Sequence, residues 1–330
     1  MIDEIPKYPP IPESLRDAAS LKLLVPFIGA GVSRIGGYPD LAHLAEGAMS
    51  YFIDQQKFDH AQLDQIAELP PRLKLSLAAD LEKEHKLEID FMKILTPADG
   101  KKDAKRDVYE QVHRLWRFSD LFVTTNYDEE LDSLVSSTLT SDSDATPDRS
   151  TITPSVIHAP QTITVDLLDH KQTVVHIHGS VQNRDSMVLT TIDYLERYQG
   201  NRHEGGQYIE NKFLTFLDQL FRTRNVLFIG YGLEELEILE YVIQKGLQKR
   251  SLQKGRARHF VLQGFFSHQL SLARSLEGYF RSFGIQLLPF SRDERDWESL
   301  IGVLDRLSEE LPPGSRLSSS ERIDMEELLQ

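Results

Sequence analysis

The chain has 330 residues, 37 Lys and Arg against 51 Asp and Glu, a formal net charge of −14, and no cysteine. This balance argues against a chain-wide basic surface for gripping a phosphate backbone. The lack of cysteine excludes disulfides, thiol nucleophiles and zinc sites of the Cys-x-x-Cys kind. The acidic, proline-rich start "MIDEIPKYPPIPESL" has no apolar signal core, and no run of about 18 apolar residues could cross a membrane, so we expect a cytoplasmic protein.

Short apolar runs that end in glycine or polar residues are spaced along the chain. Their nearly continuous apolar character is typical of buried parallel strands. Pro26 is unusual within the first run, because proline donates no hydrogen bond to a neighbouring strand. The runs cover residues 21–31, 120–128, 173–180, 225–232, 258–265 and 283–290.

Apolar residues at helical spacing lie between these runs, within residues 41–52, 209–220, 233–243 and 297–307. The alternation of strands and helices predicts an α/β fold, namely a Rossmann-like doubly wound parallel sheet of about six strands. Residues 51–118 have the pattern of extra helices, which we interpret as an inserted helical subdomain. We expect a polar surface loop at 136–148 and a flexible C-terminal tail at 311–330.

The segment "FIGAGVSRIGG" follows the first predicted strand. Glycines let a backbone approach a pyrophosphate closely, and a following helix presents N–H groups to it. The third glycine of the usual dinucleotide fingerprint is replaced by Arg34, and no Walker-type lysine is present. An ordinary tight turn is therefore the alternative. Ser33 and Arg34 favour phosphate binding, because a hydroxyl and a guanidinium are both good anion donors.

Polar residues come after several of the other runs. Asn126 and Asp128 are either a turn and a helix cap, or residues placed at the carboxyl edge of the sheet for chemistry. Asp40 is likewise a candidate cap for the next helix. A histidine before a glycine, as at His178, is either structural or catalytic. His176 and His178 share one strand face, but no third ligand is evident, so we predict no metal site.

Five short motifs occur in one order along the chain: Gly29-Ala30-Gly31-Val32-Ser33, Gly37-Tyr38-Pro39-Asp40, Thr125-Asn126-Tyr127-Asp128, His178-Gly179-Ser180 and Gly230-Tyr231-Gly232-Leu233. In this order the chain resembles the sirtuin superfamily over residues 14–310, which implies one NAD-binding catalytic domain. It departs from the deacylases in lacking the four-cysteine zinc module, the arginine after the G-x-P-D-F segment and a recognisable acyl-lysine loop. In these departures it looks like the zinc-less sirtuin-like proteins of bacterial anti-phage systems.

The resemblance implies a role for each motif residue. Asn126 would orient the ribose and the attacking water, and Asp128 would stabilise positive charge near the nicotinamide ribose. His178 would be the general base, for which a pKa near neutrality is suited. The implied nucleotide-binding residues are Gly29, Ala30, Gly31, Ser33 and Arg34 at the diphosphate, Asp40 beside the nicotinamide, Thr125 and Gly179 next to the catalytic residues, and Gly230 and Gly232 towards the adenosine.

The zinc-less proteins cleave NAD to nicotinamide and ADP-ribose, which depletes the infected cell and stops phage growth. The resemblance therefore implies an NAD glycohydrolase with NAD as substrate and no metal. It also implies a homo-oligomer controlled by a partner, such as a hexameric translocase-type ATPase or a short Argonaute, with nucleic acid reached only through that partner. The basic stretch at 245–259 is either a solvated helix end and loop, or a segment that docks to a partner or to nucleic acid.

Two other functions stay open at this point. The first is NAD-dependent deacylation or ADP-ribosyl transfer, which the missing zinc and peptide-binding features disfavour. The second is a non-catalytic module that senses NAD or ADP-ribose, which the presence of Asn126, Asp128 and His178 disfavours.

Overall fold

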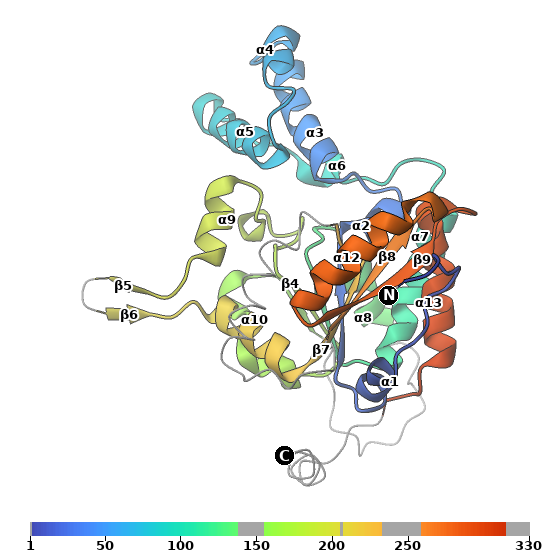
Figure 1. Ribbon diagram of the computed structural model, residues 1–330. Helices are drawn as coiled ribbons and strands as arrows, with labels where there is room; N and C mark the ends of the chain where they lie inside the picture. Colours follow the sequence, from blue (N-terminus) through green and yellow to red (C-terminus); the bar gives the residue numbers. More distant parts are fainter. Residues whose placement is uncertain (1, 138–154, 205–206, 233–258, 315–330) are drawn as a thin grey trace.

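The computed structural model describes residues 2–137, 155–204, 207–232 and 259–314 (Figure 1). Four predicted segments lie wholly or largely outside these residues. They are the loop at 136–148, the helix at 233–243, the basic stretch at 245–259 and the tail at 311–330.

A seven-stranded, all-parallel sheet in the order β3-β4-β2-β1-β7-β8-β9 forms the centre of the molecule (Figure 1). The predicted α/β class is therefore confirmed, and each of the six predicted runs contains a strand. The seventh strand, β3, was missed because three residues are too short for a sequence pattern. The strands are β1 (Leu24–Ile28), β2 (Leu121–Thr124), β3 (Ser155–Ile157), β4 (Thr173–His176), β7 (Asn225–Ile229), β8 (His259–Phe265) and β9 (Ile285–Ser291).

Pro26 lies inside β1, at the centre of the sheet. Its partner on one side is Leu227 of β7, whereas the pairing of β1 with β2 begins one residue later, at Phe27. The proline therefore stands at the start of the β2 ladder, where a missing N–H removes little pairing.

Helices cover both faces of the sheet. One face packs against α10 (Lys212–Thr223) and α12 (Leu270–Ser282), whose buried residues include Phe216 and Phe280. The other packs against α1 (Glu13–Ser20), α2 (Ala30–Ile35), α7 (Lys102–Arg114), α8 (Glu130–Ser137) and α13 (Ser299–Glu310). Successive β1 residues alternate between the two cores, with Phe27 in the first and Ile28 in the second. This alternation is what a doubly wound sheet requires.

Four further helices follow α2 in the chain. They are α3 (Leu41–Asp54), α4 (His60–Gln65), α5 (Pro71–His85) and α6 (Phe91–Ile94). They project from the top of the sheet in the view of Figure 1 and share a small core of their own, which includes Phe52 and Leu75. Helix α9 (Thr191–Tyr198) lies beside them, and an antiparallel hairpin of β5 (Arg202–Glu204) and β6 (Gln207–Ile209) comes next in the chain. Within the described residues, no helix has the length and apolar character needed to span a bilayer.

Candidate active site

The predicted site residues meet at one edge of the sheet. Strands β4, β2, β1 and β7 are neighbours and run parallel, so their carboxyl ends lie together. Gly29 is the residue after β1, Asn126 comes two residues after β2, His178 comes two residues after β4 and Gly230 is the residue after β7. In open α/β sheets this edge is where ligands bind.

The glycine loop, which begins at Gly29, is hydrogen-bonded to the end of β7. Gly29 N donates to the carbonyl of Ile229 at 2.9 Å, and Gly31 N donates to that of Gly230 at 2.8 Å. A Cβ on Gly31 would lie 2.7 Å from Gly230 O, and one on Gly230, where φ is +68°, would lie 2.6 Å from Val32 N. Both positions therefore require glycine for packing. Because these two N–H groups bind the sheet, a diphosphate at the loop would be held by other donors.

The side-chain amide of Asn126 has a fixed orientation. Its Nδ2 donates to Ser33 Oγ at 2.7 Å and to the carbonyl of Gly29 at 3.2 Å. Since a carbonyl oxygen can only accept, the nitrogen must be the atom on this side. The Nδ2 of Asn126 is thereby bonded to the glycine loop, and its Oδ1 points away from Ser33 and Gly29.

Asp128 is a buried carboxylate with three donors from the protein. It accepts from Ser33 Oγ at 2.6 Å, from the Tyr109 hydroxyl at 3.2 Å and from Glu130 N, at the start of α8, at 3.2 Å. Burial raises the pKa of Asp128, while the bonds from Ser33 and Glu130 N oppose that rise. The bond to Glu130 N bears out a role at the helix start, and the bond to Ser33 adds a second role at the glycine loop.

Two buried oxygens at this edge have no hydrogen-bond partner among the described residues. They are Asn126 Oδ1 and Thr125 Oγ1, on adjacent residues. Buried polar atoms in proteins are almost always hydrogen-bonded. An oxygen that can accept, next to a glycine loop, suits a ligand that carries hydroxyl donors, such as the ribose of a nucleotide.

His176 contacts the backbone of Asn126, and its two partners favour the protonated ring. Its Nδ1 lies 3.0 Å from the carbonyl of Asn126 and its Nε2 lies 2.7 Å from Asp132 Oδ1. Both partners only accept, so both ring nitrogens must carry hydrogen. Burial opposes this charge, but the bonds to Asp132 and Asn126 outweigh it and raise the pKa of His176. The ring therefore holds the Asn126 backbone in place. Within the described part of the chain, no group of three or more candidate side chains could hold a metal ion.

His178 has the opposite protonation state. Its Nε2 lies 2.8 Å from the hydroxyl of Tyr198 on α9. Burial, together with the positive charges of Arg72 and Arg197, lowers the pKa of His178 to about 3. The expectation of a pKa near neutrality is therefore wrong for this arrangement, because the ring is buried and faces two cations. The ring is uncharged at neutral pH.

These two histidines should give stability opposite dependences on pH. His178 is protonated only when the chain unfolds, so its contribution is present above pH 6.5, its ordinary pKa, and is lost as pH falls towards about 3. His176 contributes below its ordinary pKa and loses that contribution as pH rises through its raised value. Each effect is worth at most about 1.4 kcal/mol per pH unit.

The measurement is the free energy of unfolding by urea across this pH range. His178→Gln should flatten the acid side of the curve, and His176→Gln should flatten the neutral-to-alkaline side. Equal changes in slope from both variants would contradict the assigned protonation states.

The remaining predicted residues lie around the glycine loop. Asp40 is the N-cap of α3 and accepts from His43 N at 3.0 Å, so the capping interpretation is confirmed. Its carboxylate also lies 3.7 Å from Nε of Arg34, whose side chain is more than half exposed. Gly232 is exposed and is the last described residue after β7. The contacts expected of these residues with a nucleotide stay predictions.

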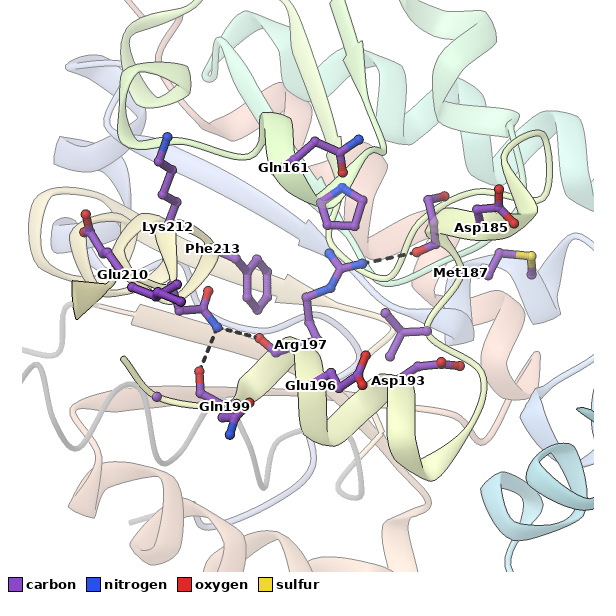
Figure 2. Close-up of a pocket in the computed structure, with 16 residues that line it drawn as sticks. Gln161, Asp185, Met187, Asp193, Glu196, Arg197, Gln199, Glu210, Lys212 and Phe213 are labelled. Atoms are coloured by element: carbon purple, nitrogen blue, oxygen red, sulfur yellow. Dashed lines mark hydrogen bonds between the residues drawn. The ribbon is translucent and has the colours of Figure 1, made fainter. Parts of the chain in front are cut away.

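A cavity of about 670 Å³ is lined by residues 185–188 and by residues of α9 and α10, and by no residue of the glycine loop (Figure 2). Through Ser186 and Val188 it lies beside the His178–Gly179 turn. Val188, in its wall, donates its N–H to the carbonyl of His178 at 2.9 Å. Arg197 contributes a buried guanidinium that donates to the carbonyls of Ile177 and Ser186. The cavity thus shares a wall with the candidate site.

Sequence reasoning missed three residues that touch the predicted ones. Tyr109 binds Asp128, Tyr198 binds His178, and Arg197 holds the backbone on both sides of the His178–Gly179 turn. Tyr109 and Arg197 lie within helices whose patterns indicate only packing, and no motif marks them.

The fold defines the class of protein: an α/β protein of the Rossmann-like kind, with a cluster of buried polar residues at the carboxyl edge of its parallel sheet. Residues 120–288, slightly more than half of the chain, match the SIR2-like domain family. The chain therefore belongs to the SIR2-like family, whose domains use NAD. A search among curated proteins found no match to the chain.

Proposed function

We propose that the protein hydrolyses NAD to nicotinamide and ADP-ribose. The observation that carries this proposal is the Asn126 amide, which Ser33 and Gly29 hold while its Oδ1 has no partner in the described part of the chain. A ribose hydroxyl would donate to that oxygen. Membership of the SIR2-like family supports NAD as the nucleotide.

The reaction breaks the bond between the nicotinamide nitrogen and the ribose carbon. The bonding electrons leave with nicotinamide, which departs neutral, and the ribose carbon acquires positive character. A water then adds to that carbon and loses a proton. The protein must hold the ribose, place the water and accept the proton.

Asn126 and His178 are suited to these tasks. Asn126 Oδ1 would accept from the ribose or from the attacking water. His178 is uncharged at neutral pH and can accept a proton, and the negative charge of a bound diphosphate near the ring would oppose the burial and the two arginine charges that lower its pKa. Asp128 binds Ser33, Tyr109 and α8, so we assign it the positioning of this cluster.

The first experiment is incubation of the purified chain with NAD, with the products then separated by chromatography. Release of nicotinamide and ADP-ribose in equal amounts is expected. Tight binding of NAD with no products, also in the presence of a partner protein, would instead favour a sensing module.

We propose further that NAD depletion serves defence against phage, with a protein partner as the trigger. This proposal rests on the resemblance to zinc-less sirtuin-like effectors. Cells that carry the gene with its genomic neighbours should lose NAD after infection, while cells with Asn126→Ala should keep it. Equal NAD levels in both would remove the defence role and leave the hydrolysis to stand alone.

Transfer of ADP-ribose or an acyl group to an acceptor is the second candidate function. The cavity beside the His178–Gly179 turn favours it, because a second substrate could lie there next to the ribose. An acylated peptide that accelerates nicotinamide release would support transfer. A rate that is independent of any added acceptor would support hydrolysis.

A further inference from the structure

Tyr109 reaches the candidate site from outside the part of the chain that matches the family. It lies on α7, in the helical segment between β1 and β2, whereas the match begins at residue 120. Its side chain is buried, and its hydroxyl lies 3.2 Å from both Asp128 Oδ1 and Ser33 Oγ. The Tyr109 hydroxyl thus contacts two predicted site residues at once.

The hydrogens in this cluster can be assigned from the acceptors. Ser33 has one hydroxyl hydrogen, and the short contact of 2.6 Å directs it to Asp128 Oδ2. The Tyr109 hydrogen then goes to Asp128 Oδ1. Ser33 is left with its lone pairs, one of which accepts from Asn126 Nδ2. Asn126 therefore donates to Ser33, and Ser33 donates to Asp128. Tyr109 donates to the other oxygen of the Asp128 carboxylate.

We propose that Tyr109 is a positioning residue for Asn126. By donating to Asp128, Tyr109 keeps the carboxylate turned so that Ser33 donates to it and accepts from Asn126. The open Oδ1 of Asn126 is thereby presented to a ligand hydroxyl. This inference rests on the proposed function, because it assigns Tyr109 to the same site.

The charge state of Asp128 determines how the site responds to loss of the Tyr109 hydroxyl. A buried carboxylate that loses a donor becomes easier to protonate. A protonated Asp128 would donate to Ser33 Oγ instead of accepting from it, and Ser33 would direct its own hydrogen elsewhere, so the bond that Ser33 accepts from Asn126 Nδ2 would lose its present geometry. The other titratable groups that act on Asp128 are Glu130 at the start of α8, His176 on β4 and Tyr38 before α3. Lys105 on α7 binds Glu130, and Glu129 acts on Tyr38. They stay unchanged in the variant.

Tyr109→Phe is the test, because it removes only the hydroxyl. The matched control is Tyr8→Phe, a partly buried tyrosine that packs against the same core and is not among the site residues. Binding of ADP-ribose is measured by calorimetry, and NAD hydrolysis is measured as a function of pH. We expect Tyr109→Phe to weaken ADP-ribose binding and to lower kcat/KM, each by about ten-fold, as expected when a buried charged group loses one hydrogen bond. The acid limb of the rate profile should move to higher pH.

A double variant separates positioning from packing. In a Ser33→Ala background, Tyr109→Phe should change ADP-ribose affinity by less than about two-fold, because Tyr109 would act through Ser33. Circular dichroism and the urea midpoint give the folded fraction, to which every affinity is normalised.

The outcomes distinguish this inference from the proposed function. Two results would overturn the role of Tyr109 and leave the proposed function standing. One is that the effects of Ser33→Ala and Tyr109→Phe on ADP-ribose affinity add in full; the other is a Tyr109→Phe protein with the affinity and the acid limb of the original. An original protein that neither binds ADP-ribose nor cleaves NAD would overturn the proposed function, and the role of Tyr109 with it.

Discussion

Asn126→Ala is expected to lower the rate of NAD hydrolysis by about 100-fold or more, which is the usual loss when a preorganised polar group at a reacting centre is removed. The variant loses the unpartnered Oδ1 and also the two bonds from Nδ2 to Ser33 and Gly29. The glycine loop would lose its bonds from Nδ2, and the ribose would lose its proposed acceptor, Oδ1. The measurement is kcat/KM for nicotinamide release.

The matched control is Gln65→Ala, which removes an exposed amide on α4. It should leave kcat/KM unchanged. An Asn126→Ala protein that is folded and cleaves NAD at the original rate would show that the site lies elsewhere.

Gly179→Ala is expected to cost about 3 kcal/mol or more of unfolding free energy and to abolish activity. Gly179 has φ of +80°, and a Cβ there would lie 2.2 Å from Ser186 O. The backbone of Ser186 is held in place, because its N–H donates to the carbonyl of Asn183 and its carbonyl accepts from Arg197. The turn would therefore shift and carry His178 with it.

Gly100→Ala separates backbone strain from the clash. Gly100 has a similar φ of +86°, but nothing lies within 4 Å of a Cβ there. This control should cost only the strain of a positive φ, about 1 kcal/mol. Urea unfolding of both variants checks the comparison, and equal losses would contradict the assigned packing of Gly179 against Ser186.

Much of the sheet could be predicted because its strands are buried on both faces and form apolar runs. The edge strand β3 could not be predicted, since Ser155–Ile157 are only partly buried and too few to form a pattern. The ends of helices could not be predicted well either, because an apolar stripe can continue beyond the last helical turn. Trp297 and Ile209 lie in the apolar stripes of two predicted helices, yet the structure places them just outside α13 and α10.

The site could be predicted only in outline. Motifs at strand ends located Gly29, Asn126 and His178 at one edge, because parallel strands bring their carboxyl ends together. Side-chain environment could not be predicted in this way. The pKa of His178 depends first on burial and then on Arg72 and Arg197, which belong to α5 and α9 and have no motif of their own.

The most direct test of the central claim is a crystal structure of the protein with ADP-ribose. We predict a ribose hydroxyl within hydrogen-bond distance of Asn126 Oδ1 and the diphosphate beside the loop from Gly29 to Arg34. ADP-ribose bound only in the cavity beside α9, with Asn126 Oδ1 still unpartnered, would contradict it.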